Sequence, residues 1–163
     1  MSDINVRAFA EPDIPELLEL MKGLARFEGY IDDFRVSEED LRVHGLGPSP
    51  RFEAFVADTD KPEGLLGMAV VFCIPWTYDL RPTLILKELF VRDDARGRGV
   101  GRLLLERVAS RARELDCPRL QWTVLDTNEP AKRFYVAAGA TTGGVWELWA
   151  LDEAAIAALC DPV

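Results

Sequence analysis

A glycine-rich segment, Arg96-Gly97-Arg98-Gly99-Val100-Gly101, is the part of the chain best suited to hold a ligand. Glycines let the backbone turn tightly and bring its N–H groups close to a bound group. The apolar run Leu84–Val91 precedes the segment and a helical pattern follows it. A helix N-terminus carries unpaired N–H groups and a partial positive charge, which suits pyrophosphate. Arg96, Arg98 and Arg102 could add cationic contacts.

Three phosphate-binding motifs must be distinguished at this segment. A P-loop ends in Gly-Lys-Ser or Gly-Lys-Thr, whereas this chain continues with Val100-Gly101-Arg102. A dinucleotide fingerprint has the spacing G-x-G-x-x-G, whereas the three glycines here alternate and lie late in the chain. The third motif, Arg-x-x-Gly-x-Gly, grips the pyrophosphate of coenzyme A, and Arg96-x-x-Gly99-x-Gly101 matches it. We therefore favour a coenzyme A site over a glycine-rich turn without a ligand.

The segment and its surroundings resemble the GCN5-related N-acetyltransferase (GNAT) family over nearly the whole chain. Within it, the resemblance is closest to the branch that acetylates diamines (spermidine and spermine) and thialysine. The likeness to this branch lies in Lys22–Glu28, Arg92–Gly101, Asn128–Pro130 and Trp146. It implies an enzyme that moves the acetyl group of acetyl-CoA onto a primary amine of a small molecule. A protein or peptide amine as acceptor, or a non-catalytic acetyl-CoA sensor, remain the alternatives.

The resemblance implies roles for residues on the cofactor side. The backbone of Leu89, Phe90 and Val91 is expected to hold the pantetheine arm, since a strand edge offers N–H groups to its amides. Tyr135 is expected to be the general acid for the leaving thiolate, because a phenol with a pKa of about 10 matches its basicity. Without the motif, Tyr135 would be a core aromatic residue beside Phe134. The expected cofactor-binding residues are Leu89, Phe90, Val91, Arg96, Gly97, Arg98, Gly99, Val100, Gly101, Arg102, Asn128, Ala131 and Lys132.

Asn128 has two interpretations that are compatible with each other. As a residue just before a helical pattern, with Pro130 behind it, it is a helix cap. By resemblance it also faces the cofactor. For Lys132 and Arg133, contact with phosphate and exposure to solvent remain equally open.

Glu28 and Glu88 are the candidates for recognising the amine, and Glu88 could also act through water as a general base. Glu28 lies near the end of the first predicted helix, where relatives line the substrate site. Glu88 lies in an otherwise apolar run, in which alternation places Lys87 and Glu88 on opposite faces. A charge that faces a core or cleft needs a partner. The expected acceptor-binding residues are Phe27, Glu28, Lys87, Trp122 and Trp146, although the two tryptophans are equally well explained as core residues.

Lys87 marks a departure from the diamine branch. Members of that branch usually have two adjacent acids at this place, and this chain has Lys87 followed by Glu88. Because one negative charge has become positive, a polyamine is a less favoured acceptor. A smaller or zwitterionic amine is favoured instead.

The composition sets limits on the partners. The chain has 163 residues, 48% of them hydrophobic, and a net charge of -9, so nucleic acid is not expected as a partner. No apolar run approaches the roughly 18 residues of a membrane span, and the N-terminus does not resemble a signal peptide. Cys73, Cys117 and Cys160 lack metal-ligand spacing, so we expect no metal and reduced thiols in a cytoplasmic protein. By resemblance alone, we expect a homodimer.

Alternation and helical spacing predict the elements that position these residues. The predicted strands are Ile4–Phe9, Phe52–Ala57, Leu65–Ile74, Thr83–Val91, Leu120–Leu125 and Val145–Leu151. The predicted helices run from Asp13 as cap to Phe27, from Ser37 as cap, from Val100 to Leu115, from Asn128 to Gly139, and from Asp152.

This order predicts a single α/β (α+β) GNAT-like domain over residues 1–163. Its central mixed, mostly antiparallel sheet is flanked by helices. The cofactor is expected where strands Leu84–Val91 and Leu120–Leu125 splay apart.

Overall fold

The computed structural model describes residues 4–59, 61–143 and 148–160. The chain divides into two compact units, residues 1–125 and residues 126–163. The first unit contains β1 (Ile4–Ala8), α1 (Ile14–Glu28), α2 (Glu38–Gly45), β2 (Glu53–Thr59), β3 (Gly67–Ile74), β4 (Thr83–Val91), α3 (Val100–Glu114) and β5 (Arg119–Gln121). The second contains α4 (Glu129–Ala137) and α5 (Glu153–Cys160). A single domain over residues 1–163 stays a prediction.

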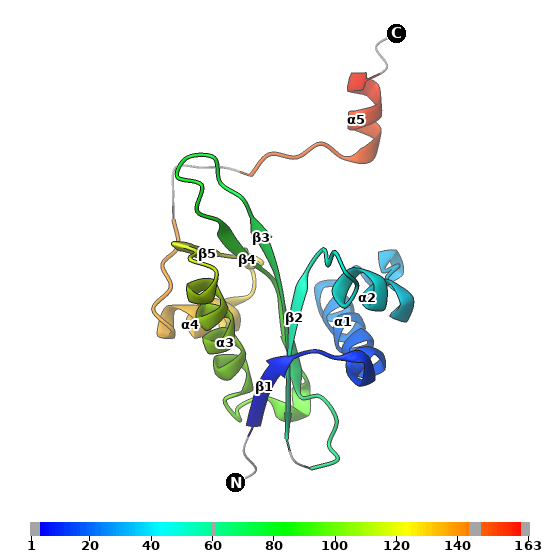
Figure 1. Ribbon diagram of the computed structural model, residues 1–163, viewed down its shortest axis with the longest axis vertical. Coiled ribbons are helices and arrows are strands. Elements are labelled where there is room, and N and C mark those ends of the chain that lie inside the picture. The colour runs from blue at the N-terminus through cyan, green and yellow to red at the C-terminus, as the bar shows by residue number, and fades with distance from the viewer. Residues whose placement is uncertain (1–3, 60, 144–147, 161–163) are drawn as a thin grey trace. The chain divides into compact units, whose positions relative to one another are not determined.

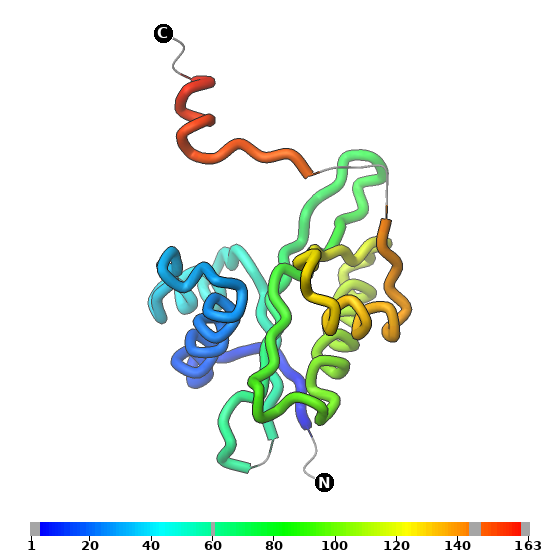
Figure 2. The backbone as a smooth tube through the Cα atoms, turned by 180° about the vertical axis from the view of Figure 1, so that it is seen from behind, coloured from blue at the N-terminus to red at the C-terminus, as the bar shows by residue number. Residues whose placement is uncertain are grey.

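The first unit is a five-stranded sheet in the order β1-β2-β3-β4-β5. The first four strands pair antiparallel, and β4 and β5 pair parallel. Parallel neighbours need a crossover, and α3 provides it. Helices α1 and α2 lie on one face of the sheet and α3 lies on the other, as both views show (Figures 1 and 2). The predicted fold class, a mixed and mostly antiparallel sheet flanked by helices, is confirmed.

Helix α1 packs its apolar side against the sheet. Leu17, Leu20 and Leu24 follow helical spacing and are buried. They share a core cluster with sheet residues that include Val56 and Val70. Burying one such side chain is worth about 2 kcal/mol, so this interface fixes α1, and the residues at its C-terminal end, against β3 and β4.

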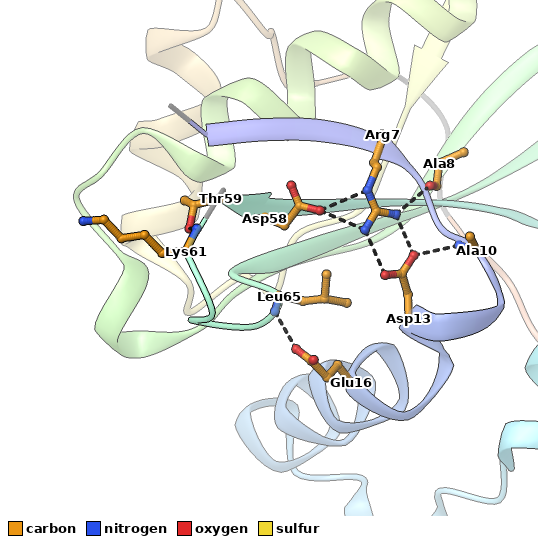
Figure 3. A network of polar contacts seen from close by, with 9 residues as sticks. All are labelled: Arg7, Ala8, Ala10, Asp13, Glu16, Asp58, Thr59, Lys61 and Leu65. Carbon is orange, nitrogen blue, oxygen red and sulfur yellow. Dashed lines mark hydrogen bonds and ion pairs between the residues drawn. The ribbon is translucent and has the colours of Figure 1, made fainter. Parts of the chain in front are cut away.

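The start of α1 differs from the prediction that Asp13 caps the helix. Asp13 occupies the N-cap position, but its carboxylate makes no capping bond. It accepts bonds from the guanidinium of Arg7 at 2.6 and 2.9 Å and from the Ala10 N–H at 2.7 Å (Figure 3). Arg7 also contacts Asp58 at 2.8 Å. A charged, bidentate partner binds a carboxylate more strongly than a helix N–H does, which explains the difference.

The other predicted caps are confirmed. The Ser37 hydroxyl accepts a bond from the Asp40 N–H at 3.2 Å, and the Asp40 carboxylate accepts one from the Ser37 N–H at 2.8 Å. In the second unit, Asn128 Oδ1 accepts a bond from the Ala131 N–H at 3.2 Å. Gly139, two residues after α4, has a φ of 92° and ends the helix in the left-handed conformation.

Two predicted strands differ from the structure. Strand β5 is only Arg119–Gln121, not Leu120–Leu125. Of the predicted strand Val145–Leu151, residues 145–147 lie outside the described part, and residues 148–151 are not in a strand. Leu148 and Trp149 are exposed. Apolar alternation alone does not make a strand, because a strand also needs a ladder partner. No helix within the described ranges is long and apolar enough to cross a membrane.

Candidate active site

Strands β4 and β5 part within the sheet. Their parallel pairing covers Thr83 to Ile85 on β4 and ends where Ile85 meets Gln121. Strand β4 continues to Val91, held on its other edge by β3. Over Leu89, Phe90 and Val91 the edge that faces away from β3 therefore has no ladder partner among the described residues. This edge makes no ladder bonds, as the prediction for these three residues requires, and the Val91 carbonyl accepts a bond from Arg96 Nε at 3.4 Å.

The glycine-rich loop follows directly. Gly97 and Gly99 have φ values of 75° and 85°, a region that a side chain with a Cβ enters only with strain. A Cβ built on either glycine would meet no atom within 4 Å, so backbone conformation rather than packing requires glycine here. Val100 then anchors the start of α3 in the core. The N-terminus of α3 has no side-chain cap and no acidic residue in its first turn, which leaves its positive end open to an anion.

The three predicted phosphate-binding arginines already have carboxylate partners. Arg96 pairs with Asp93 at 2.8 Å, Arg98 with Glu63 at 2.9 Å, and Arg102 with Glu106 at 2.9 Å. The first and third pairs are exposed and the Arg98–Glu63 pair is half-buried, and exposed ion pairs contribute little stability. A pyrophosphate could therefore replace the carboxylates at low energetic cost. Glu63, which lies between β2 and β3, is a neighbour of the loop that sequence reasoning missed.

A cavity of about 890 Å³ lies between α1 and the end of β4. Its lining includes Leu20, Phe27, Phe90 and Arg96. The Arg96 guanidinium lies 5.9 Å from the centroid of the Phe27 ring, within reach of a cation–π contact. A Cβ on Gly23 would come within 2.9 Å of the Phe90 ring, so this glycine lets α1 approach β4. The cavity thus brings predicted acceptor and cofactor residues together.

A β-bulge in β4 decides where Glu88 points. Leu86 pairs with Val71 and Glu88 pairs with Val70, so Lys87 is an additional residue between two consecutive rungs. Val70 belongs to the core cluster that contains α1. Because directly opposite residues share a face, Glu88 faces α1. The side chain of Lys87 is exposed on the bulge. An additional residue changes the alternation of a strand. Simple alternation could therefore not establish whether Lys87 or Glu88 faces α1.

Glu88 is half-buried, and one of its two carboxylate oxygens is fully buried. Its Oε2 is inaccessible to solvent and has no hydrogen-bond partner among the described residues. Burial raises the pKa of Glu88; the Lys87 ammonium lowers it, and the negative charge of Glu28 raises it further. A carboxyl group held in this way exchanges protons nearer to neutral pH than an exposed one does.

Tyr30 is a neighbour of these acids that sequence reasoning missed. Burial raises the pKa of Tyr30, and so do the charges of Glu88 and then Glu28. Gly29, with a φ of 83°, ends α1, and the Tyr30 N–H bonds to the Ala25 carbonyl at 2.9 Å. This turn sets the phenol beside the two acids. The glycine at a helix end followed by an aromatic residue was the available signal.

The remaining predicted acceptor residues lie in three different places. Phe27 is 56% exposed and borders the cavity. Trp122 follows β5 directly, at the point where the pairing with β4 has ended, and is half-buried. Trp146 lies outside the described residues.

The second unit carries the other predicted cofactor residues on α4. Tyr135 is half-buried, with its ring centroid 5.1 Å from that of Phe134. The N–H of Ala131 is engaged by the Asn128 cap. Lys132 contacts the Asp126 carbonyl and pairs with Glu129 at 2.7 Å.

The glycine loop and the divergence of β4 from β5 lie within a segment that is similar to a known protein family. The model of the acetyltransferase (GNAT) family matches residues 14–140. The chain belongs to the GNAT family. This confirms the resemblance seen in the motifs and the predicted enzyme class, an N-acetyltransferase that uses acetyl-CoA.

Individual GNAT relatives agree with this assignment. A thialysine N-epsilon-acetyltransferase of Sus scrofa is 30% identical over 86% of this chain and 85% of the relative. An L-ornithine N5-acetyltransferase of Arabidopsis thaliana is 30% identical over 78% of this chain and 56% of the relative. An integron cassette protein from the V. cholerae mobile metagenome has a TM-score of 0.78, 26% identity and 98% coverage of both chains. The predicted diamine and thialysine branch is thereby confirmed.

Proposed function

We propose that this GNAT enzyme acetylates the side-chain amine of a small molecule that binds beside Glu28, Tyr30 and Glu88. The observation that carries the proposal is the buried Oε2 of Glu88, which lies on the cofactor strand and has no partner in the described part of the chain. A buried carboxylate without a partner is unfavourable, and an ammonium group would supply one. Glu28 adds a second negative charge close enough to shift the pKa of Glu88.

On the donor side, the β4 edge and the loop are proposed to bind acetyl-CoA. The unpaired edge at Leu89–Val91 is proposed to bond the amides of the pantetheine arm. The N–H groups at the start of α3, together with Arg96, Arg98 and Arg102, are proposed to bind the pyrophosphate. The apolar residues in the lining of the cavity, with Arg92 and Arg96 among its charged residues, support an apolar arm that ends in phosphate. Asn128, Ala131 and Lys132 remain proposed cofactor contacts.

The proposed proton transfers follow from the environments of two residues. Glu88, directly or through water, accepts a proton from the ammonium, and its raised pKa suits that task. The freed amine attacks the thioester carbonyl, and the C–S bond breaks as the new C–N bond is completed. Backbone N–H groups of β4 polarise the carbonyl. Tyr135 gives its proton to the departing thiolate, a role that rests on the family motif. The second proton of the attacking nitrogen, lost as the amide forms, returns the Tyr135 phenolate to a phenol through water.

Lys87 refines the acceptor class. A cation beside an amine-binding acid repels a second ammonium group and attracts a carboxylate. An amino acid with a side-chain amine carries both charges. The names of the relatives, acetyltransferases of thialysine and of ornithine, support such a substrate. We therefore propose a zwitterionic amino acid as the acceptor, in preference to a diamine or polyamine.

A paired acceptor screen tests this proposal by following thiol release from acetyl-CoA. Each amino acid is matched with the diamine that lacks only its carboxylate: ornithine with putrescine, and lysine with cadaverine. Thialysine, spermidine and a lysine peptide complete the set. We expect kcat/KM to be at least about tenfold higher for each amino acid, since a single ion pair is worth about 1.4 kcal/mol.

Each other outcome has a defined meaning. Higher kcat/KM for the diamines would remove Lys87 as a carboxylate contact. Turnover only on the peptide would establish the protein-acetylating alternative. Acetyl-CoA binding without turnover on any amine would establish the sensor alternative.

We also propose a cytoplasmic homodimer. The three cysteines, present as free thiols, support a reducing compartment, and the dimer rests on the resemblance to the diamine branch. Light scattering of the purified chain measures the assembly directly.

A further inference from the structure

Two cysteines that are distant in sequence meet at one end of the first unit. Cys73 is the second-last residue of β3 and lies opposite Leu84 of β4. Its neighbour Phe72 packs against the core cluster on the α1 side. Strand alternation therefore turns Cys73 toward the α3 side of the sheet.

Cys117 reaches the same place from the end of α3. It follows the C-cap Leu115 by two residues, and its N–H bonds to the Ala112 carbonyl at 2.8 Å. Its Sγ lies 4.0 Å from the Leu115 carbonyl oxygen. Burial raises the pKa of the Cys117 thiol, and the charge of Cys73 and a side-chain hydrogen bond with it raise the pKa further. Leu84, the partner of Cys73, pairs in turn with Leu120 of β5, so the register of the sheet brings the segment of Cys117 to the same end of the sheet as Cys73.

We propose that Cys73 and Cys117 form a redox-active dithiol, which a small disulfide such as glutathione disulfide converts into an intramolecular disulfide. The two residues differ in their readiness to react. The Cys73 side chain is exposed, so it meets the oxidant first. Cys117 is half-buried and keeps its proton more firmly, so it acts second.

The disulfide forms by two steps of thiol–disulfide exchange. The Cys73 thiolate attacks one sulfur of glutathione disulfide, whose S–S bond breaks, and one glutathione leaves and takes up the proton that Cys73 lost. The Cys117 thiolate then attacks Sγ of Cys73, and the second glutathione leaves with the proton from Cys117. The protein has lost two electrons and two protons, and the oxidant has become two thiols.

The disulfide would join β3 to the connection between α3 and β5. Both segments flank the short β4–β5 ladder, which starts where Thr83 meets Arg119. A bond here closes a long loop in the unfolded chain, which lowers the entropy of unfolding. We expect the melting temperature to rise by about 5 °C on oxidation and to return on treatment with dithiothreitol.

The test treats the folded, full-length protein with glutathione disulfide and measures its mass and its thiol count under denaturing conditions. The chain has three cysteines. We expect a loss of about 2 Da, one remaining thiol, and a linked pair of peptides that contain Cys73 and Cys117.

Cysteine variants separate this pairing from general thiol reactivity. Cys160 is exposed on α5, in the other unit, so Cys160→Ser serves as the matched control and should still lose about 2 Da. Cys73→Ser and Cys117→Ser should show neither this loss of mass nor the linked pair of peptides. Separate adducts on Cys73 and Cys117 of the unaltered chain, a linkage through Cys160, or three unchanged thiols would each overturn the proposal.

Discussion

Ile85 of β4 pairs with Gln121 of β5, and this pair is the last one between the two strands. The bulge at Lys87 follows two residues later. A bulge bends its strand and strengthens the local twist, so it lies where it can direct β4 away from β5. The same irregularity turns Glu88 toward α1. One local feature thus accounts for both the unpaired edge proposed for the cofactor and the buried acid proposed for the amine.

Glu88→Gln should lower kcat/KM by about 10- to 100-fold, because the variant cannot accept a proton. Glu88 must be ionised to act as a base, so activity of the unaltered enzyme should rise with pH through the raised pKa of Glu88. The pH profile of kcat/KM should show that acidic limb, and the variant should lose it. Glu28→Gln is the matched control, which should raise KM but keep the limb. An unchanged profile in Glu88→Gln would contradict the role as base.

Lys87→Glu should shift the acceptor preference toward diamines. Replacing the cation restores two adjacent acids and repels the carboxylate of an amino acid. We expect the ratio of kcat/KM for ornithine to that for putrescine to fall by about 100-fold. Loss of the attractive cation and gain of a repulsive anion should each contribute about tenfold. Lys87→Gln should give an intermediate ratio. The same ratio in all three proteins would place Lys87 outside the acceptor site.

Tyr135→Phe should reduce kcat by about 100-fold, since the thiolate would leave without its acid. The Kd for acetyl-CoA, measured by calorimetry, should stay within about twofold, because the phenol acts on the leaving group. Tyr78, which is 83% exposed between β3 and β4, provides a control through Tyr78→Phe, which should leave kcat unchanged. Equal kcat for Tyr135→Phe and the unaltered enzyme would remove Tyr135 from the acid role.

Gly99→Ala should weaken acetyl-CoA binding by about tenfold or more. The left-handed φ of Gly99 disfavours alanine by roughly 1–2 kcal/mol, so the loop and its N–H groups should move. Gly29 has nearly the same φ and equally open surroundings. Gly29→Ala should therefore cost similar stability but leave the Kd for acetyl-CoA unchanged. Calorimetric titration of both variants checks this, and equal Kd values would exclude the loop as the pyrophosphate site.

Asp13→Asn should lower the free energy of unfolding at pH 7 by about 2 kcal/mol, since the charged bonds to Arg7 are weakened. Hydrogen bonding from Arg7 lowers the pKa of Asp13, so this stabilisation exists above the unfolded value of about 3.9 and is lost as pH falls through the lower, folded value. Urea unfolding from pH 7 to pH 2.5 should show the difference between variant and unaltered chain shrinking. Asp116→Asn, at an exposed ion pair, is the control. A difference that did not change with pH would contradict the linkage.

Local patterns in the sequence predicted much of the fold and indicate a candidate donor site. The spacing of Arg96, Gly99 and Gly101 is a local property, because a turn and a helix N-terminus are built from consecutive residues. Ser37 and Asn128 were predicted as caps for the same reason, since each bonds a residue three positions away. Strand β4 was placed correctly because its apolar run is long.

Contacts between residues of different elements were beyond such patterns. The carboxylate of Asp13 binds Arg7 of β1 instead of the helix N-terminus, and a partner on another element leaves no mark in the spacing around Asp13. Strand β5 is shorter than its apolar run, because a ladder depends on the course of its neighbour as well as on side-chain pattern.

The acceptor side shows most clearly the difference between what local patterns and what tertiary contacts determine. The residue types were readable in advance: an acid at Glu28, and a cation followed by an acid at Lys87 and Glu88. Their arrangement depends on the pairing of β4 with β3, where the bulge reverses the alternation and turns Glu88 toward α1. The turn at Gly29 likewise brings Tyr30 beside two acids from different elements. Sequence supplies the charges, but register and burial determine which of them meet and which remain without a partner.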